Sequence, residues 1–151
     1  MNAIKVALDT NILVYAEGLN GDERRQRALD LLQKLTQEFV ALPVQTLGEL
    51  FNVLVKKAGG SPHDARAAIL SWRDSFEVVE TSSKVMVAAA DLAVQHRLPI
   101  WDAVILAAAS EAGCRLLVSE DSQDGFTWGG VTIVNPFAVR QHPLLIAALQ
   151  E

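Results

Sequence analysis

Apolar and polar positions along this chain follow two periods. Runs of four or five mostly apolar residues, the length of a buried strand, occur at 4–8, 39–42, 76–79, 115–119 and 131–134. Stretches with apolar residues three or four positions apart, as one face of a helix requires, cover 22–37, 44–58, 62–74, 83–96 and 100–112. A short last helix is predicted from Pro143 onward, because proline is tolerated at the first helical position.

Strands that alternate with helices in this way predict parallel pairing in an α/β domain. No internal repeat, low-complexity tract or linker interrupts the pattern, and 151 residues suit one compact core. The sequence therefore predicts a single domain over residues 1–151. In parallel sheets, ligands bind beyond the carboxyl ends of the strands, where the strand order reverses, so the residues at those ends deserve the closest inspection.

Composition narrows the possible functions. The formal net charge is -5, so no general basic character indicates a nucleic-acid partner, although a nuclease that binds divalent cations must also concentrate carboxylates. The one cysteine, Cys114, excludes an intramolecular disulfide and a cysteine-rich zinc site, and we expect a buried thiol. Residues 1–5 lack a signal-peptide pattern and no apolar run is long enough to cross a bilayer, which predicts a cytoplasmic protein.

Four acidic residues stand where such a sheet would present its site. Asp9 follows the first predicted strand, and Asp121 lies just past the fourth. Glu49 falls among the apolar positions of its helix. Asp102 opens the apolar run 103–109, where an unpaired charge is costly to bury.

Each of these acids also has a structural explanation. Asp9 can cap a helix, Asp102 can stabilise its own helix through the macrodipole, Glu49 can be solvated on a helix flank, and Asp121 can share a turn with Gly125. The four together are harder to explain in this way, because neighbouring carboxylates raise one another's pKa unless a cation compensates. Oxygen-only ligands suit Mg²⁺ or Mn²⁺ rather than zinc.

Polar neighbours can support these acids. Asn11 offers an amide to a water or phosphate oxygen, or starts a helix, and Ser119 can orient a carboxylate or bond only to backbone. Asp124 is either a fifth acid or, as we favour, a partner of the turn at Gly125. The basic residues that can position a phosphate chain, or equally form a solvated helix face, are Arg24, Arg25, Arg27, Lys56 and Lys57.

The acids fall in four ordered segments: Leu8-Asp9-Thr10-Asn11, Gln45-Thr46-Leu47-Gly48-Glu49-Leu50, Ile100-Trp101-Asp102-Ala103 and Ser119-Glu120-Asp121. In this order they resemble the signatures of PIN-domain ribonucleases, and the chain length is similar to that of VapC-type toxins from bacterial toxin–antitoxin pairs. The resemblance implies a three-layer α/β/α domain with a five-stranded parallel sheet, often paired into a homodimer.

The same resemblance implies an Mg²⁺- or Mn²⁺-dependent endoribonuclease with an RNA substrate and a small antitoxin protein as partner. It implies that the catalytic and metal-binding set is Asp9, Glu49, Asp102 and Asp121, with Asn11 and Ser119 as supporting polar groups. One departure concerns Asp124, which stands one residue later than the family's usual second acid in the last segment.

Three other classes of protein share part of this pattern. A haloacid-dehalogenase-type phosphatase needs a second aspartate two residues after the first, where this chain has Asn11. A response-regulator receiver needs an aspartate after the third strand, where only Glu80 and Thr81 follow Val79. A catalytically silent PIN-like interaction module stays open, although the intact acidic set argues against it.

Overall fold

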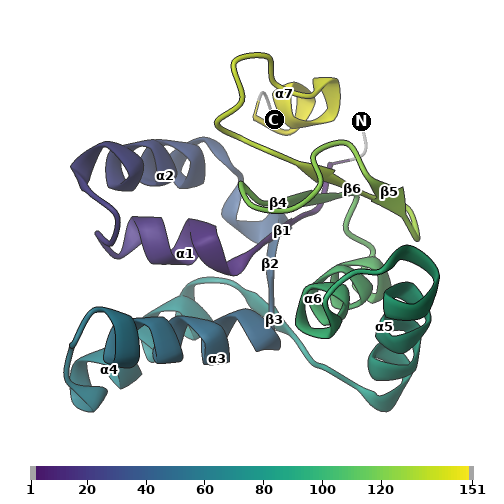
Figure 1. Ribbon diagram of the computed structural model, residues 1–151. Helices are drawn as coiled ribbons and strands as arrows, with labels where there is room; N and C mark the ends of the chain where they lie inside the picture. Colours follow the sequence, from purple (N-terminus) through teal and green to yellow (C-terminus); the bar gives the residue numbers. More distant parts are fainter. Residues whose placement is uncertain (1–2, 150–151) are drawn as a thin grey trace.

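The computed structural model describes residues 3–149, which fold around one central sheet (Figure 1). Residues 1–2 of the N-terminal stretch and residues 150–151 of the predicted domain lie outside the described residues. The strands are β1 Val6–Leu8, β2 Val40–Pro43, β3 Glu77–Val79, β4 Leu116–Val118, β5 Thr127–Trp128 and β6 Val131–Val134. Their order in the sheet is β3-β2-β1-β4-β6-β5, and all neighbours are parallel except β6 and β5.

Helices cover both faces of this sheet, which gives the three-layer α/β/α arrangement that was predicted (Figure 1). The α-helices are α1 Thr10–Ala16, α2 Asp22–Lys34, α3 Val44–Asn52, α4 Pro62–Ser75, α5 Ser83–His96, α6 Ile100–Glu111 and α7 Pro143–Leu149. Two shorter segments are the 3-10 helix η1 Gln37–Phe39 and the π-helix η2 Val53–Lys57. Among the described residues, no helix has the length and apolar character needed to span a membrane.

Alternating strand residues build two separate cores. Val6 and Leu8 pack with α1 to α4 and α7 on one face, whereas Ala7 and its β2 neighbour Ala41 pack with α5 and α6 on the other. Beyond its first turn, α6 is buried at every position from 103 to 109, as expected for a helix that is apolar on all sides. The small side chains of β1 and β2 let this helix approach the sheet closely. Cys114 is buried in the same core, as predicted.

The sheet has one strand more than the five that were predicted. The additional strand, β5, pairs antiparallel with β6 through a turn at Gly129 and Gly130. These glycines have φ angles of 58° and 81°, and a two-residue hairpin turn with both central φ angles positive strongly favours glycine. The Gly-Gly pair was therefore the available sequence signal for this two-residue edge strand.

Three further predicted boundaries differ from the structure. The helix predicted over 44–58 is α-helical only to Asn52, and it continues as η2, where the Ala58 amide donates to the Val53 carbonyl oxygen at 3.0 Å. The helix predicted over 22–37 ends at Lys34. The strand predicted over 39–42 is β2 Val40–Pro43, and Pro43 is its last residue, where a missing N–H interrupts no further pairing along the strand.

Candidate functional site

The carboxyl ends of β1 and β4 mark the point where the strand order reverses. In the sheet, β2 and β3 follow on one side of β1, and β4 and β6 follow on the other side of β1. Asp9 follows β1 directly, and Ser119 follows β4. The Asp9 amide donates to the Val118 carbonyl oxygen at 3.0 Å, so the two ends are joined by backbone. A crevice at such a reversal is the usual ligand position in a parallel sheet.

Asp9 is the buried member of the acidic set, with 8% of its surface exposed. Its carboxylate caps α1 by accepting from the Thr10 amide at 2.7 Å, and it accepts from the buried Ser119 hydroxyl at 2.8 Å. Burial raises the pKa of Asp9 to about 6, although both hydrogen bonds lower it, and the charges of Asp102 and Glu49 raise it further. The carboxylate is therefore held in one position and carries an electrostatic cost.

Glu49 reaches the same place from α3. One carboxylate oxygen accepts from the Thr10 hydroxyl at 2.5 Å, and the other accepts from the Gln45 amide at 3.3 Å. Thr10 therefore links Glu49 to the start of α1, next to Asp9. Thr46, the other threonine of this segment, donates instead to the Pro43 carbonyl oxygen at 2.7 Å and is fully buried.

Asp102 and Asp121 complete the set from the exposed side. Asp102 lies in the first turn of α6, and Asp121 lies in the loop after β4, where it accepts from the Asn11 amide at 3.4 Å. Partial desolvation raises the pKa of Asp102, and the charges of Glu49 and Asp121 add to this effect. The four acids that were singled out in the sequence thus come from four separate segments. Glu49 and Asp102 act on the pKa of Asp9, and Glu49 and Asp121 act on that of Asp102.

One face of α1 holds the loop that carries Asp121. The Asn11 amide donates to the Ser119 hydroxyl at 3.2 Å, and its carbonyl accepts from the Glu120 amide at 3.3 Å. The Tyr15 hydroxyl donates to the Glu120 carboxylate at 2.5 Å, and burial followed by this bond raises the pKa of Tyr15 to about 12. Sequence reasoning missed Tyr15 and Glu120. The spacing of four residues from Asn11 to Tyr15, which places both on one helix face, was the available signal.

Asp124 lies farther along the same loop. Its carboxylate accepts from the Asn135 amide at 2.8 Å and so ties the loop to the end of β6. Gly125 beside it has a φ of 89° and donates its amide to the Ile133 carbonyl oxygen at 2.7 Å. Among residues 3–149, no hydrogen bond joins Asp124 to the other acids.

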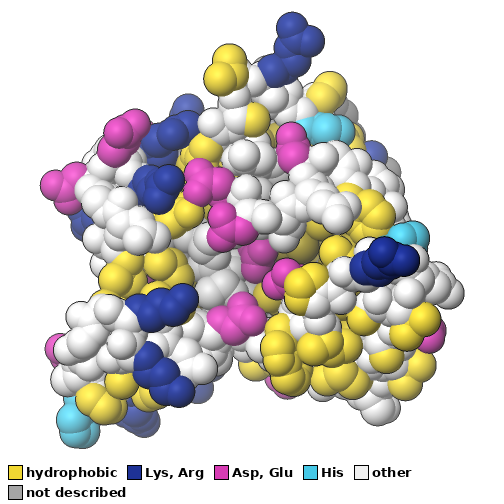
Figure 2. Space-filling model, in the orientation of Figure 1, with side chains coloured by type: hydrophobic (Ala, Val, Ile, Leu, Met, Phe, Trp, Pro, Cys, Tyr) yellow, Lys and Arg dark blue, Asp and Glu magenta, His cyan; other side chains and the backbone are white. Residues whose placement is uncertain are grey.

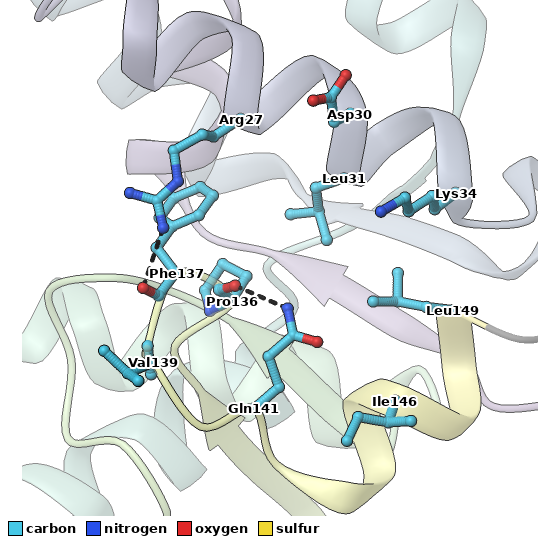
Figure 3. A pocket seen from close by; sticks show the side chains of 11 residues that line it. Arg27, Asp30, Leu31, Lys34, Pro136, Phe137, Val139, Gln141, Ile146 and Leu149 are labelled. Atoms are coloured by element: carbon cyan, nitrogen blue, oxygen red, sulfur yellow. Dashed lines mark hydrogen bonds between the residues drawn. The ribbon is translucent and has the colours of Figure 1, made fainter.

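Acidic and basic side chains occupy different parts of this surface. Figure 2 shows Asp and Glu gathered down the middle of one face, with Lys and Arg mainly to their left. The Arg24 guanidinium lies over the Tyr15 ring, 5.4 Å from its centroid. Arg27 is directed elsewhere, because it stacks on Phe137 and donates to the Phe137 carbonyl oxygen at 3.0 Å in a pocket between α2 and α7 (Figure 3). Lys57, at the end of η2, lines a pocket that also contains Asp121.

The acidic set fits a hard divalent cation by its chemistry. All four groups offer oxygen donors, and no Lys or Arg forms an ion pair with them in the described chain. Desolvation by burial and, after it, the neighbouring carboxylate charges raise the pKa of Asp9 and Asp102, and a bound cation would lower both pKa values. In the described conformation, however, no three Asp, Glu, His or Cys side chains of residues 3–149 converge closely enough to hold one ion.

Comparison with known families addresses the identity of this site. The family model for the PIN domain matches residues 6–126, a range that contains Asp9, Glu49, Asp102 and Asp121. The chain belongs to the PIN domain family. Comparison with curated proteins gives no match.

Solved structures with the same PIN fold include several toxin–antitoxin proteins. A toxin–antitoxin complex from Klebsiella pneumoniae is 24% identical with a TM-score of 0.67, covering 89% of this chain and 100% of that chain. VapC20 of Mycobacterium tuberculosis, described as a sarcin–ricin loop cleaving toxin, is 20% identical with a TM-score of 0.63, covering 75% and 87%. DNA-bound VapBC from Salmonella typhimurium is 20% identical with a TM-score of 0.59, covering 86% and 96%. At these identities the likeness establishes the fold.

Proposed function

We propose that this PIN domain is a metal-dependent endoribonuclease and the toxin of a toxin–antitoxin pair. The proposal rests on the position of Asp9, Glu49, Asp102 and Asp121 around the reversal point of the sheet, where no Lys or Arg of the described residues pairs with them. Carboxylates in this position suit a divalent cation better than an uncharged ligand, and the cation in turn can bind a phosphate. The toxin–antitoxin proteins among the similar folds support the biological role.

In the proposed reaction, water loses a proton and its oxygen bonds to the phosphorus of an RNA phosphodiester. The bond from phosphorus to the leaving oxygen breaks, and that oxygen takes up a proton from solvent. An Mg²⁺ or Mn²⁺ ion held by the four carboxylates would supply positive charge to the phosphate and lower the pKa of water. Asp9 is fixed by Thr10 and Ser119, so it provides the rigid ligand position. Asp102 and Asp121 are exposed and can turn inward toward the ion. Asp102 has no hydrogen-bond partner within residues 3–149, so its carboxylate is able to accept the proton of water.

The proposal includes the partners of such a toxin. A small antitoxin protein would bind it, two copies would form a homodimer, and the protein would act as a single domain in the cytoplasm. The toxin–antitoxin complexes among the similar structures support the antitoxin. The exposed apolar side chains of α5 and the start of α6 support the homodimer.

The test uses purified protein with a structured RNA. Cleavage is expected with Mg²⁺ or Mn²⁺ and is expected to stop with EDTA. Asp9→Asn and Asp102→Asn are each expected to lower the cleavage rate by about a hundredfold or more, because each removes charge from the metal site. Asp91→Asn, an exposed acid on α5, is the matched control and should cleave as the wild type does.

Expression in a bacterial host separates a toxin from other nucleases. Growth should stop with the wild type and continue with Asp102→Asn. If Asp102→Asn cleaves RNA at the wild-type rate, the assignment of the site is wrong. If no RNA is cleaved but the wild type still binds a small partner protein, the chain is a catalytically silent interaction module instead.

A further inference from the structure

A pocket of about 360 Å³ lies directly beside the acidic site. It shares Thr10, Asn11 and Asp121 with that site. The rest of its lining comes from α1, from the loop after α1 and from η2, and consists of Val14, Tyr15, Leu19, Asn20, Val53 and Lys57. A pocket of this size, lined by apolar and polar groups side by side, is large enough for one small ligand.

The lining divides into walls and a rim. Val14, Leu19 and Val53 form apolar walls that are buried or half-buried. Asn20 and Lys57 are exposed at the rim, and neither side chain forms a hydrogen bond or ion pair with another of the described residues. The rim therefore presents one amide and one positive charge that the fold itself does not use.

The backbone on one side of the pocket is also unusual. Val53 and Lys57 are the first and last residues of the π-helix η2, the segment that replaces the last turns of the predicted helix 44–58. π-helical segments are rare and are frequent at functional sites. Asn20 has a φ of 68°, a left-handed conformation that asparagine tolerates better than most residues.

We propose that this pocket binds one nucleotide of the RNA strand, the nucleotide that flanks the cleaved phosphate, and the proposal rests on the proposed ribonuclease function. Apolar walls accept the faces of a base, the Asn20 amide meets its polar edge, and the Lys57 ammonium meets a phosphate. Because Asp121 and Asn11 line the pocket as well as the acidic site, a strand whose phosphate reaches the acids can place its next nucleotide in the pocket. The positive charge of Lys57 offsets the repulsion between that strand and the surrounding carboxylates.

Charge favours RNA over an apolar peptide as the occupant. An apolar peptide side chain between these walls would leave Lys57 without a partner. A nucleotide contacts the walls with its base and Lys57 with its phosphate. The pocket of about 420 Å³ in Figure 3 carries no such inference, because Arg27 there already donates to Phe137 and none of the four acids lines it.

The first test compares two adjacent lysines of η2. Lys57 lines the pocket and Lys56 does not, although both are exposed. Binding of a short single-stranded RNA of randomised sequence is measured by fluorescence anisotropy in EDTA, over a series of salt concentrations. Lys57→Met is expected to weaken binding about tenfold and to reduce the slope of log affinity against log salt by about 0.7, the loss of one phosphate contact, whereas Lys56→Met should change neither.

The second test fills the pocket. Val53→Trp is expected to raise KM for RNA and to change which base is preferred beside the cleavage position, without changing the affinity for Mn²⁺ measured by calorimetry. Val87→Trp, an exposed valine on α5 with 63% of its surface accessible, is the control. Circular dichroism of each variant verifies folding. If Val53→Trp does not fold, the comparison of Lys57→Met with Lys56→Met decides whether the pocket binds RNA.

The outcomes separate this proposal from the proposed function. If the wild type cleaves RNA but Lys57→Met and Lys56→Met have equal salt slopes, the nucleotide site is wrong and the ribonuclease stands. If the wild type cleaves no RNA and Lys57→Met alone lowers the salt slope, the site binds RNA and the ribonuclease is wrong. An unchanged cleavage profile and KM in a folded Val53→Trp would also overturn the site, as expected if an apolar peptide is the true occupant.

Discussion

Asp9 concentrates the electrostatic cost of the site in one side chain. Its burial raises the pKa of the carboxyl to about 6, whereas the ordinary value is 3.8. The folded protein therefore holds this proton more tightly than the unfolded chain does. Without a metal ion, the fold is expected to lose stability as pH rises from about 4 through about 6, because the buried carboxylate becomes charged.

Replacement of Asp9 by Asn removes this dependence. In EDTA, the unfolding free energy of the wild type should fall by about 2 kcal/mol relative to that of Asp9→Asn between pH 4 and pH 7.5, as the shift in pKa converts. Urea unfolding at a series of pH values measures this difference. Parallel pH profiles for the two proteins would mean that Asp9 does not titrate as its burial implies.

The sequence predicted the acidic residues better than the groups that hold them. Asp9 and Asp102 were visible because a charge stood beside an apolar run. Glu49 was visible for the same reason, because it stands among the apolar positions of its helix. Tyr15 was not singled out, because its bond to Glu120 joins residues 105 positions apart and depends on how α1 packs beside β4. The roles of all these residues in metal binding and catalysis stay predictions.

At the scale of elements, α1 is the part that organises the site. This helix has only seven residues, yet its first turn and the residue before it supply Asp9, Thr10 and Asn11. Asn11 connects it to the loop after β4 through three hydrogen bonds. Because α1 is short and buried from Ile12 to Ala16, tertiary packing stabilises it more than its own helix propensity does.

Loss of the Asn11 side chain should loosen the loop that carries Asp121. In Asn11→Ala, the Glu120 amide loses its acceptor, and its hydrogen exchange is expected to become about tenfold faster, the equivalent of about 1.4 kcal/mol. The Gly125 amide, which donates to Ile133, is the internal control and should keep its rate. Equal protection of Glu120 in both proteins would show that the loop is held by other contacts.

Element prediction succeeded where a segment is both long and periodic. The limits of α5 match the predicted 83–96, and α6 begins at the predicted position. Prediction failed at β5, because two residues carry no measurable period, and at η2, because an apolar pattern does not distinguish α-helical from π-helical hydrogen bonding.

At the scale of the whole molecule, the helices α5 and α6 present an apolar surface to solvent. Figure 2 shows hydrophobic side chains over the region of α5 and α6, where Val87, Val94 and Trp101 are 63%, 82% and 51% exposed. A monomer rarely leaves such side chains together in water without a partner. This surface is where we expect two copies of the chain to meet.

A charge on this surface should separate the copies. Val94→Glu is expected to raise the dissociation constant of the proposed dimer by about a hundredfold, because a twofold interface would bury two new carboxylates, one from each copy. Sedimentation velocity measures the change. Val139→Glu, another exposed valine, serves as the control and should stay dimeric. A dimer that survives Val94→Glu must use another surface.

The strand order also has a consequence for how other chains can attach. The two outermost strands are β3, with three residues, and β5, with two. A long unpaired strand edge invites another polypeptide to add itself as a further strand. Within the described sheet these edges are too short for such addition. A partner of this molecule therefore gains little from strand addition and depends on contacts with side chains of the helices and loops, where single substitutions can change its specificity.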